Sequence, residues 1–152
     1  MARIGLISLY VVESNGIRFL ASALRESGYE VDEYYLGYHL HHVERTLDPE
    51  DVQRLIDKMR ERGVAVVGLS VRIGALLTHA IELTQAIQER LSVPVVWGGA
   101  HVTMAPTECV DHADYLVLGE GEAAMVEVAG CLLAGKSAAD IDNVWTREGG
   151  TE

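Results

Sequence analysis

Apolar and polar residues follow two different spacings along this chain. Short runs rich in valine, isoleucine and leucine are typical of buried strands, and apolar residues that recur every three or four positions are typical of helices with one apolar face. The runs predict strands over 3–9, 30–36, 64–71, 93–97 and 115–118. The longer spacing predicts helices from Ser14 or Asn15 to a stop at Gly28, from Pro49 to Gly63, over 77–91 and over 122–133.

Strands that alternate with helices in this way predict an α/β fold, with a parallel sheet covered by helices on both faces. Because the crossovers of such sheets are right-handed, few topologies remain. We predict a doubly wound, five-stranded parallel sheet of flavodoxin-like (Rossmann-like) order 2-1-3-4-5. The 152 residues suit one domain over 1–137 and a polar tail over 138–152, in which 142–146 offer a short additional edge strand.

The helical spacing also assigns inward-facing side chains. In the last two helices these are Leu77, Ala80, Ile81, Thr84, Ile87 and Leu91, then Met125, Val126, Ala129, Leu132 and Leu133. Cys131 lies within the last pattern, so we expect a buried thiol there. Together with Cys109 it forms no Cys-x-x-Cys spacing, which leaves neither a disulfide framework nor an obvious metal site.

Two predicted strands end abruptly in glycine. The run over 93–97 continues as Gly98-Gly99-Ala100-His101, and the run over 115–118 continues as Gly119-Glu120-Gly121-Glu122. Because glycine has no Cβ, it lets the backbone approach a ligand closely or take a positive φ. On neighbouring parallel strands, these ends would form one slot at the carboxyl edge of the sheet, where open α/β sheets bind their ligands.

Charge and composition exclude several classes of protein. The net charge of -11 argues against a nucleic-acid binder, which needs a basic surface. No apolar run approaches the roughly 20 residues of a membrane-spanning helix. The first residues pass directly into a strand pattern, which leaves no room for a signal peptide. We therefore expect a cytoplasmic protein with neither nucleic acid nor membrane as its partner.

Two common ligands of this architecture fit the residues poorly. A phosphorylated receiver domain needs carboxylates at its strand ends to hold Mg²⁺, but two of the ends read Ser8-Leu9-Tyr10 and Leu69-Ser70-Val71. A dinucleotide site could use Gly119-Glu120-Gly121-Glu122-Ala123-Ala124, which matches Gly-x-Gly-x-x-Ala. That match lies on the last βα turn rather than the first, and its glutamates would repel a pyrophosphate.

Three segments together resemble the cobalamin-binding domain, in the form found ahead of radical S-adenosylmethionine (SAM) enzymes. They are Val66-Val67-Gly68-Leu69-Ser70-Val71-Arg72, Pro94-Val95-Val96-Trp97-Gly98-Gly99-Ala100-His101-Val102-Thr103 and Ala113-Asp114-Tyr115-Leu116-Val117-Leu118-Gly119-Glu120-Gly121-Glu122. The pairing of Gly-Gly-x-His-x-Thr with Gly-Glu-Gly-Glu is fairly specific to that subgroup, and the similarity spans nearly the whole chain. It implies that a corrin ring lies over the carboxyl edge and that its nucleotide tail enters the slot.

The resemblance also implies roles for residues of the slot. Ser70 matches the serine that faces the benzimidazole of the tail, and Gly98 and Gly99 match the pair that lets the tail pass against the backbone. A branched side chain at Gly99 is expected to fill the slot and abolish binding. The expected cofactor-binding residues are Tyr10, Val11, Val12, Glu13, Ser14, Asn15, Gly16, Ser70, Arg72, Gly98, Gly99, Ala100, His101, Gly119, Glu120 and Gly121.

The first loop departs from the Asp-x-His-x-x-Gly motif of methionine synthase and mutase domains, whose histidine binds the lower face of the cobalt. With Gly16 set on the glycine of that motif, Val11 replaces the aspartate and Glu13 replaces the histidine. We therefore expect base-off cobalamin without a histidine ligand, its lower face meeting residues 10–13 or water. Loss of that donor should favour cobalt(I), which suits methyl transfer or radical chemistry.

The function implied is that of a module that binds cobalamin, as methylcobalamin or hydroxocobalamin, and presents it to a radical SAM catalytic domain in cis or in trans. The module should catalyse nothing alone, because the Cys-x-x-x-Cys-x-x-Cys of a [4Fe–4S] cluster is absent, so SAM and the cluster would belong to the partner domain. A corrinoid-free interaction or sensor domain and a flavin or nucleotide binder stay open, although the apolar and acidic first loop disfavours the latter. We interpret His39, His41 and His42 as a solvated loop, since no fourth zinc ligand is evident.

Overall fold

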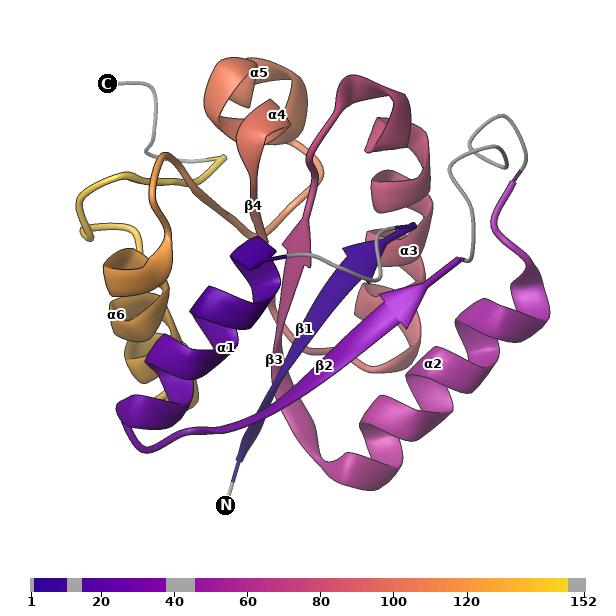
Figure 1. Ribbon diagram of the computed structural model, residues 1–152, viewed down its shortest axis with the longest axis horizontal. Coiled ribbons are helices and arrows are strands. Elements are labelled where there is room, and N and C mark those ends of the chain that lie inside the picture. Colours follow the sequence, from indigo (N-terminus) through magenta and orange to yellow (C-terminus); the bar gives the residue numbers. More distant parts are fainter. Residues whose placement is uncertain (1, 11–14, 38–45, 148–152) are drawn as a thin grey trace.

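The centre of the molecule is a six-stranded sheet in the order β2-β1-β3-β4-β5-β6 (Figure 1). The computed structural model describes residues 2–10, 15–37 and 46–147. The strands are β1 (Arg3–Leu9), β2 (Glu30–Leu36), β3 (Val64–Ser70), β4 (Val95–Gly98), β5 (Tyr115–Val117) and β6 (Val144–Trp145). The first five run parallel in the predicted order, and β6 pairs antiparallel with β5.

The α/β, flavodoxin-like prediction is confirmed, with one difference at the edge of the sheet. The sheet has a sixth strand, which falls within the 142–146 segment noted as an option, so it is neither five-stranded nor wholly parallel. Two residues suffice for β6 because Leu118 N also donates to Asn143 O at 2.9 Å, which extends the pairing with β5. Residues 144–145 of the polar tail are therefore part of the sheet.

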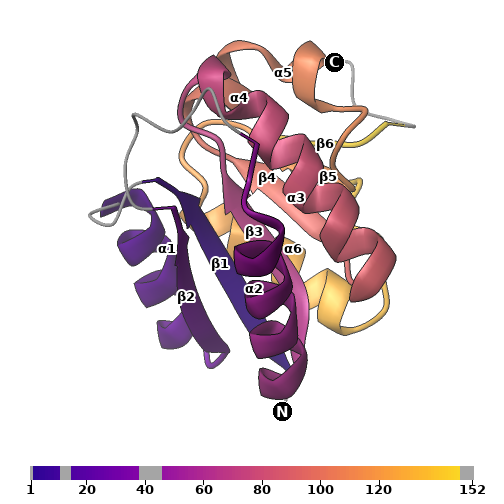
Figure 2. The same cartoon turned by 90° about the vertical axis from the view of Figure 1, so that its right-hand side faces the viewer.

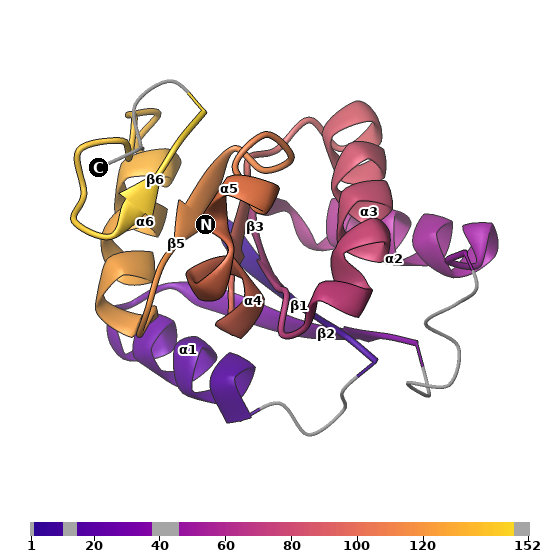
Figure 3. The same ribbon diagram turned by 90° about the horizontal axis from the view of Figure 1, so that it is seen from above.

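Four long helices cover the two faces of the sheet. They are α1 (Asn15–Glu26), α2 (Pro49–Arg62), α3 (Leu77–Arg90) and α6 (Glu122–Leu133). Seen from above, α1 and α6 lie on one side of the strands and α2 and α3 on the other (Figure 3). Figure 2 looks onto the side that α2 and α3 cover. A short 3-10 turn, η2 (Gly74–Leu76), precedes α3, and two short helices, α4 (Ala100–Met104) and α5 (Pro106–Cys109), follow β4.

The ends of α2 show how local sequence sets an element. The Asp48 side chain accepts a hydrogen bond from Glu50 N at 2.8 Å, and Pro49 takes the first helical position, where its missing N–H costs nothing. Gly63 ends the helix in the left-handed conformation at φ 72°. The predicted start and stop of this helix are both confirmed.

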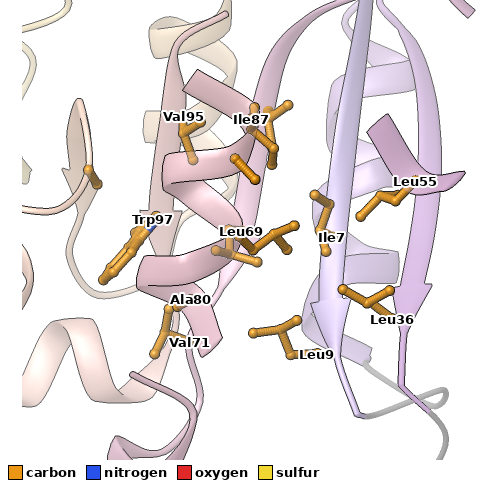
Figure 4. Packing of buried hydrophobic residues seen from close by; sticks show 14 of the residues in the cluster. Ile7, Leu9, Leu36, Leu55, Leu69, Val71, Ala80, Ile87, Val95 and Trp97 are labelled. Atoms are coloured by element: carbon orange, nitrogen blue, oxygen red, sulfur yellow. The ribbon is translucent and has the colours of Figure 1, made fainter. Parts of the chain in front are cut away.

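The core consists of two apolar layers, one on each face of the sheet. Strand residues alternate between them: Val95 and Trp97 pack under α2 and α3, whereas Val96 packs under α1 and α6. Figure 4 shows the first layer, in which Leu69 and Trp97 lie beneath α3. Trp97 is fully buried, and its Nε1 donates to Thr84 Oγ1 at 2.8 Å, so its polar atom is satisfied inside the core.

The buried stripes of the last two long helices differ from those predicted. In α3 the side chains of Leu83 and His79 are buried while those of Leu77, Ile81 and Leu91 are only partly buried. In α6 the buried residues include Ala124 and Val128, whereas Val126, Leu132 and Leu133 are partly exposed, and the expected burial of Cys131 is only partial. Nearly every position of α6 is apolar, so the spacing alone does not fix which side faces the sheet.

No helix within the described part of the chain combines the length and apolarity that crossing a membrane requires.

Candidate functional site

A cavity of about 230 Å³ opens at the carboxyl ends of β3, β4 and β5, on the face of the sheet that α1 and α6 cover. We call it the slot. The strand ends lie level with one another, since Ser70 pairs with both Ser8 of β1 and Gly98 of β4. Its lining residues are Gly16, Ile17, Leu20, Gly68, Leu69, Ser70, Val96, Trp97, Gly98, Gly99, Val117, Gly119, Glu120, Gly121, Glu122 and Met125.

The floor of the slot is made by strand residues without large side chains. Alternation along β3 and β4 points Gly68, Ser70 and Gly98 toward the α1 and α6 face. A Cβ built on Gly98 would meet nothing closer than Val117 O at 3.7 Å, so this glycine leaves room that almost any side chain would occupy. The sequence thus creates the slot by omitting side chains at the ends of two central strands.

The walls of the slot differ in polarity. Ile17 and Leu20 of α1 and Met125 of α6 supply apolar surface, and Ile17 and Met125 are each only 3% exposed. The connection from β5 to α6 supplies the exposed carboxylate of Glu120, and Glu122 stands in the first turn of α6. The slot therefore suits a ligand with an apolar end, held by small residues and backbone groups.

Gly99 lines the slot with its backbone, but it is the connection from β4 to α4 that requires it to have no side chain. Its φ is 111°, and a Cβ built on it would stand 2.7 Å from Val71 O. The same segment is tied to β3 by hydrogen bonds from Val71 N to Gly98 O at 2.8 Å and from His101 N to Val71 O at 3.1 Å. A side chain at Gly99 would collide with the backbone of Val71, the residue after β3, which corrects the expectation that it would fill the slot.

His101 serves this connection and does not line the slot. Its Nε2 lies 3.1 Å from Glu108 Oε2, and its ring covers Gly74, whose Cβ would approach His101 Cε1 to 3.1 Å. Its backbone and ring together join the β3–α3, β4–α4 and α5 segments. Arg72 and Ala100 are exposed and also lie outside the lining.

Tyr10 lies at the end of β1 with its ring turned to the opposite face of the sheet. Its backbone is left-handed at φ 60°, its amide donates to Leu36 O at 2.8 Å, and its side chain joins the core under α2 and α3. The ring lies 5.3 Å from that of His79, centroid to centroid. Burial, with a smaller contribution from the charge of Glu82, raises the pKa of the phenol. Tyr10 thus belongs to the core on the opposite face of the sheet instead of lining the slot.

The structure brings together part of the predicted site. Gly16, Ser70, Gly98, Gly99, Gly119, Glu120 and Gly121 line the slot, whereas Tyr10, Asn15, Arg72, Ala100 and His101 do not. Val11, Val12, Glu13 and Ser14 lie outside the described residues, as do His39, His41 and His42. Among the residues that the structure does describe, no three His, Cys, Asp or Glu side chains cluster to hold a metal ion.

Sequence reasoning missed the apolar wall and one polar side chain. The apolar wall consists of Ile17, Leu20 and Met125. The helical spacing could have revealed them, because each lies on the inward side of its helix, in the part that follows a strand end. The polar residue is Thr103, whose Oγ1 donates to Gly99 O at 3.2 Å and accepts from Gly119 N at 2.9 Å. The sequence did point to Thr103, since it is the threonine of the Gly-Gly-x-His-x-Thr motif.

Comparison with known proteins identifies a family and several similar folds. The family model described as the B12-binding domain matches residues 4–129. No curated protein matches the sequence significantly. Among solved structures, the radical SAM methyltransferase TsrM from Kitasatospora setae, with cobalamin and a [4Fe-4S] cluster bound, has a TM-score of 0.76 at 23% identity and covers 95% of this chain.

Two further structures show the same fold. TsrM with tryptophan substrate and the SAM analog aza-SAM gives a TM-score of 0.74 at 22% identity over 93% of this chain. A cobalamin-binding protein from Desulfitobacterium hafniense DCB-2 gives 0.65 at 21% identity over 86% of this chain. The match spans only 28% and 29% of the two TsrM chains, and 58% of the Desulfitobacterium protein.

Proposed function

The chain belongs to the B12-binding domain family, and from that premise we propose that it binds cobalamin with the nucleotide tail in the slot. The observation that supports this most directly is Gly98, because a Cβ there would project into the cavity with no protein atom closer than 3.7 Å. Because Gly98 has no side chain, a ligand can pass close to the backbone here, in space that even the methyl group of an alanine would begin to fill. The flat, apolar base of the tail fits the wall made by Leu20 and Met125.

Several side chains would bind and orient the tail. Ser70 offers a hydroxyl at the end of β3, on the floor of the slot, where it can donate a hydrogen bond to the unsubstituted ring nitrogen of the base. Gly119 and Gly121 let the β5–α6 backbone form the far wall without side chains. Because Glu120 and Glu122 carry negative charge at that wall, we expect the phosphate of the tail to lie nearer Ser70 and Gly98.

We also propose that the cobalamin is bound base-off and without a histidine ligand. The tail cannot occupy the slot and also coordinate the cobalt, and Glu13 stands where related domains have their histidine. The bound cofactor would supply methyl-transfer or radical chemistry through its cobalt. The protein's part is to hold the ring over the carboxyl edge and leave its upper face open.

The partner we propose is a radical SAM catalytic domain, joined to this module or acting in trans. Support comes from TsrM, described as a radical SAM methyltransferase, in which the matching segment is 29% of the chain. SAM and the [4Fe–4S] cluster would be bound by that partner, because the two cysteines of this chain, Cys109 and Cys131, fall short of the usual four-ligand set.

The test is a reconstitution with hydroxocobalamin. The protein is mixed with excess hydroxocobalamin and desalted, and its visible spectrum is recorded. We expect retained colour at about one cofactor per chain, with a base-off spectrum that lacks the features of histidine ligation. A colourless protein would contradict cobalamin binding and favour a corrinoid-free interaction or sensor domain. A histidine-ligated spectrum would contradict only the base-off proposal.

A further inference from the structure

The two glycine loops that flank the slot are joined by one side chain. Thr103, in the last turn of α4, donates its Oγ1 hydrogen to Gly99 O at 3.2 Å and accepts a hydrogen bond at the same oxygen from Gly119 N at 2.9 Å. Gly99 belongs to the β4–α4 connection and Gly119 to the β5–α6 connection, and both line the slot. The hydroxyl therefore spans the gap between neighbouring strand ends.

The Thr103 hydroxyl donates one of these two hydrogen bonds and accepts the other. A threonine hydroxyl has one hydrogen to donate and lone pairs that accept. Its donation to the carbonyl four residues earlier fixes the side-chain rotamer, which aims a lone pair at Gly119 N. Valine has the same shape as threonine but can make neither bond.

Among the described residues, no atom packs against Gly119 at the position where a side chain would begin. Gly119 is left-handed at φ 73°, and a Cβ built on it would find no heavy atom within 4 Å. Thr103 is itself exposed, so if its hydroxyl were lost, water could satisfy the freed amide at little cost to the fold. The consequence of losing the hydroxyl is therefore a loop that shifts, rather than a protein that unfolds.

We propose that Thr103 is a positioning residue that sets the width of the slot by holding the Gly99 and Gly119 loops at a fixed separation. This inference rests on the proposed cobalamin-binding function, because slot width matters only if a ligand tail enters it. Thr103 acts through the two backbone groups and need not contact the cofactor. Its effect should appear in cofactor affinity and residence time and not in the stability of the cofactor-free protein.

The experiment compares three variants with the wild type. Thr103→Val removes the hydroxyl, Thr103→Ser retains it, and Thr107→Val makes the same substitution at an exposed threonine of α5 outside the slot lining. Hydroxocobalamin affinity and dissociation rate are measured for each. Thermal unfolding and NMR exchange of the Gly119 amide are measured without cofactor.

We expect Thr103→Val to bind hydroxocobalamin about fivefold to tenfold more weakly, because the two hydrogen bonds that hold the slot at its binding width are lost. Dissociation should be faster, the Gly119 amide should exchange faster, and thermal unfolding should be unchanged. Thr103→Ser and Thr107→Val should behave as the wild type does.

Three results would overturn the inference. They are wild-type affinity in Thr103→Val, an equal loss in Thr103→Ser, and a large drop in the unfolding temperature of cofactor-free Thr103→Val. A wild-type protein that binds no cobalamin would instead overturn the proposed function. In that case the exchange of the Gly119 amide would still show whether Thr103 joins the two loops, since that measurement needs no cofactor.

Discussion

The backbone oxygen of Val71 occupies the position that a side chain on Gly99 would need, because a Cβ on Gly99 would stand only 2.7 Å from it. That oxygen already accepts from His101 N at 3.1 Å, so it cannot move without loosening α4 from the end of β3. Gly99 is thus required by the meeting of two strand ends.

Gly99→Ala should therefore destabilise the fold. Its φ of 111° is unfavourable for any L side chain, and the collision is with backbone, so the free energy of unfolding should fall by roughly 1–3 kcal/mol or more. Urea unfolding monitored by circular dichroism measures the change. Unfolding at the same urea concentration as the wild type would contradict this account of Gly99.

Gly98→Leu should separate binding from stability. The Cβ at this position has 3.7 Å to its nearest neighbour, so the fold should accept the side chain while the slot is filled. We expect stability close to that of the wild type and little or no bound hydroxocobalamin after desalting. Gly98→Ala, which fills less of the cavity, should show an intermediate loss. Full binding by Gly98→Leu would place the cofactor tail elsewhere.

The contrast between these neighbouring glycines marks the limit of what the sequence could predict. The apolar runs over 93–97 and 115–118 and the glycines that follow them were enough to predict a slot at the carboxyl edge, because parallel strands end together. Which glycine opens the slot depends on the direction of each Cβ. That direction depends on the registers of β3 and β4, which local patterns do not determine.

A similar limit applies to the helices around the slot. The start and stop signals of α2 were readable because Asp48, Pro49 and Gly63 act locally. The inward side of α6 was not, because ten of its residues are small or apolar and tertiary packing selects among them. The short helices α4 and α5 were missed since neither is long enough to show a helical period, although Pro106 marks the start of the second.

Gly37→Ala should be destabilising because of Tyr10. A Cβ on Gly37 would lie 2.4 Å from two atoms of the Tyr10 ring, and its φ is 90°. Gly28→Ala is the matched control, since Gly28 has nearly the same φ of 94° but nothing within 4 Å of its Cβ. The difference between the two losses in unfolding free energy reports the collision alone. Equal losses would contradict it.

Thr84→Val should weaken the core by about 1–3 kcal/mol, the usual cost of leaving a buried donor without a partner. Trp97 Nε1 donates to Thr84 Oγ1 at 2.8 Å, and both side chains are fully buried. Thr84→Ser retains the hydroxyl and should lose less, with only the methyl group missing. Urea unfolding of the three proteins measures these changes, and a Thr84→Val protein as stable as the wild type would show that this hydrogen bond contributes little.

The loss of unfolding free energy at low pH, the acid limb of the stability curve, should depend on Asp32, near the amino end of β2. Arg62 Nε and Nη2 donate to its two carboxylate oxygens at 2.9 and 3.0 Å, and Arg3 Nη1 donates at 3.0 Å. The hydrogen bond from Arg62 is the main cause that lowers the pKa of Asp32, against some opposition from burial. A lowered pKa in the folded state means that the unfolded chain takes up the proton first as the pH falls.

This contribution to stability is complete above the unfolded pKa of about 4 and is lost as the pH falls through the lower folded value. Arg62→Gln should therefore reduce stability near neutral pH and make it fall less steeply below about pH 4. Arg54→Gln is the matched control on the same helix, because Arg54 pairs with Glu50 and Asp51 of its own helix, and ion pairs of this kind at the surface contribute little. Urea unfolding across this pH range measures both variants, and equal acid limbs for the two would show that Asp32 does not control the acid response.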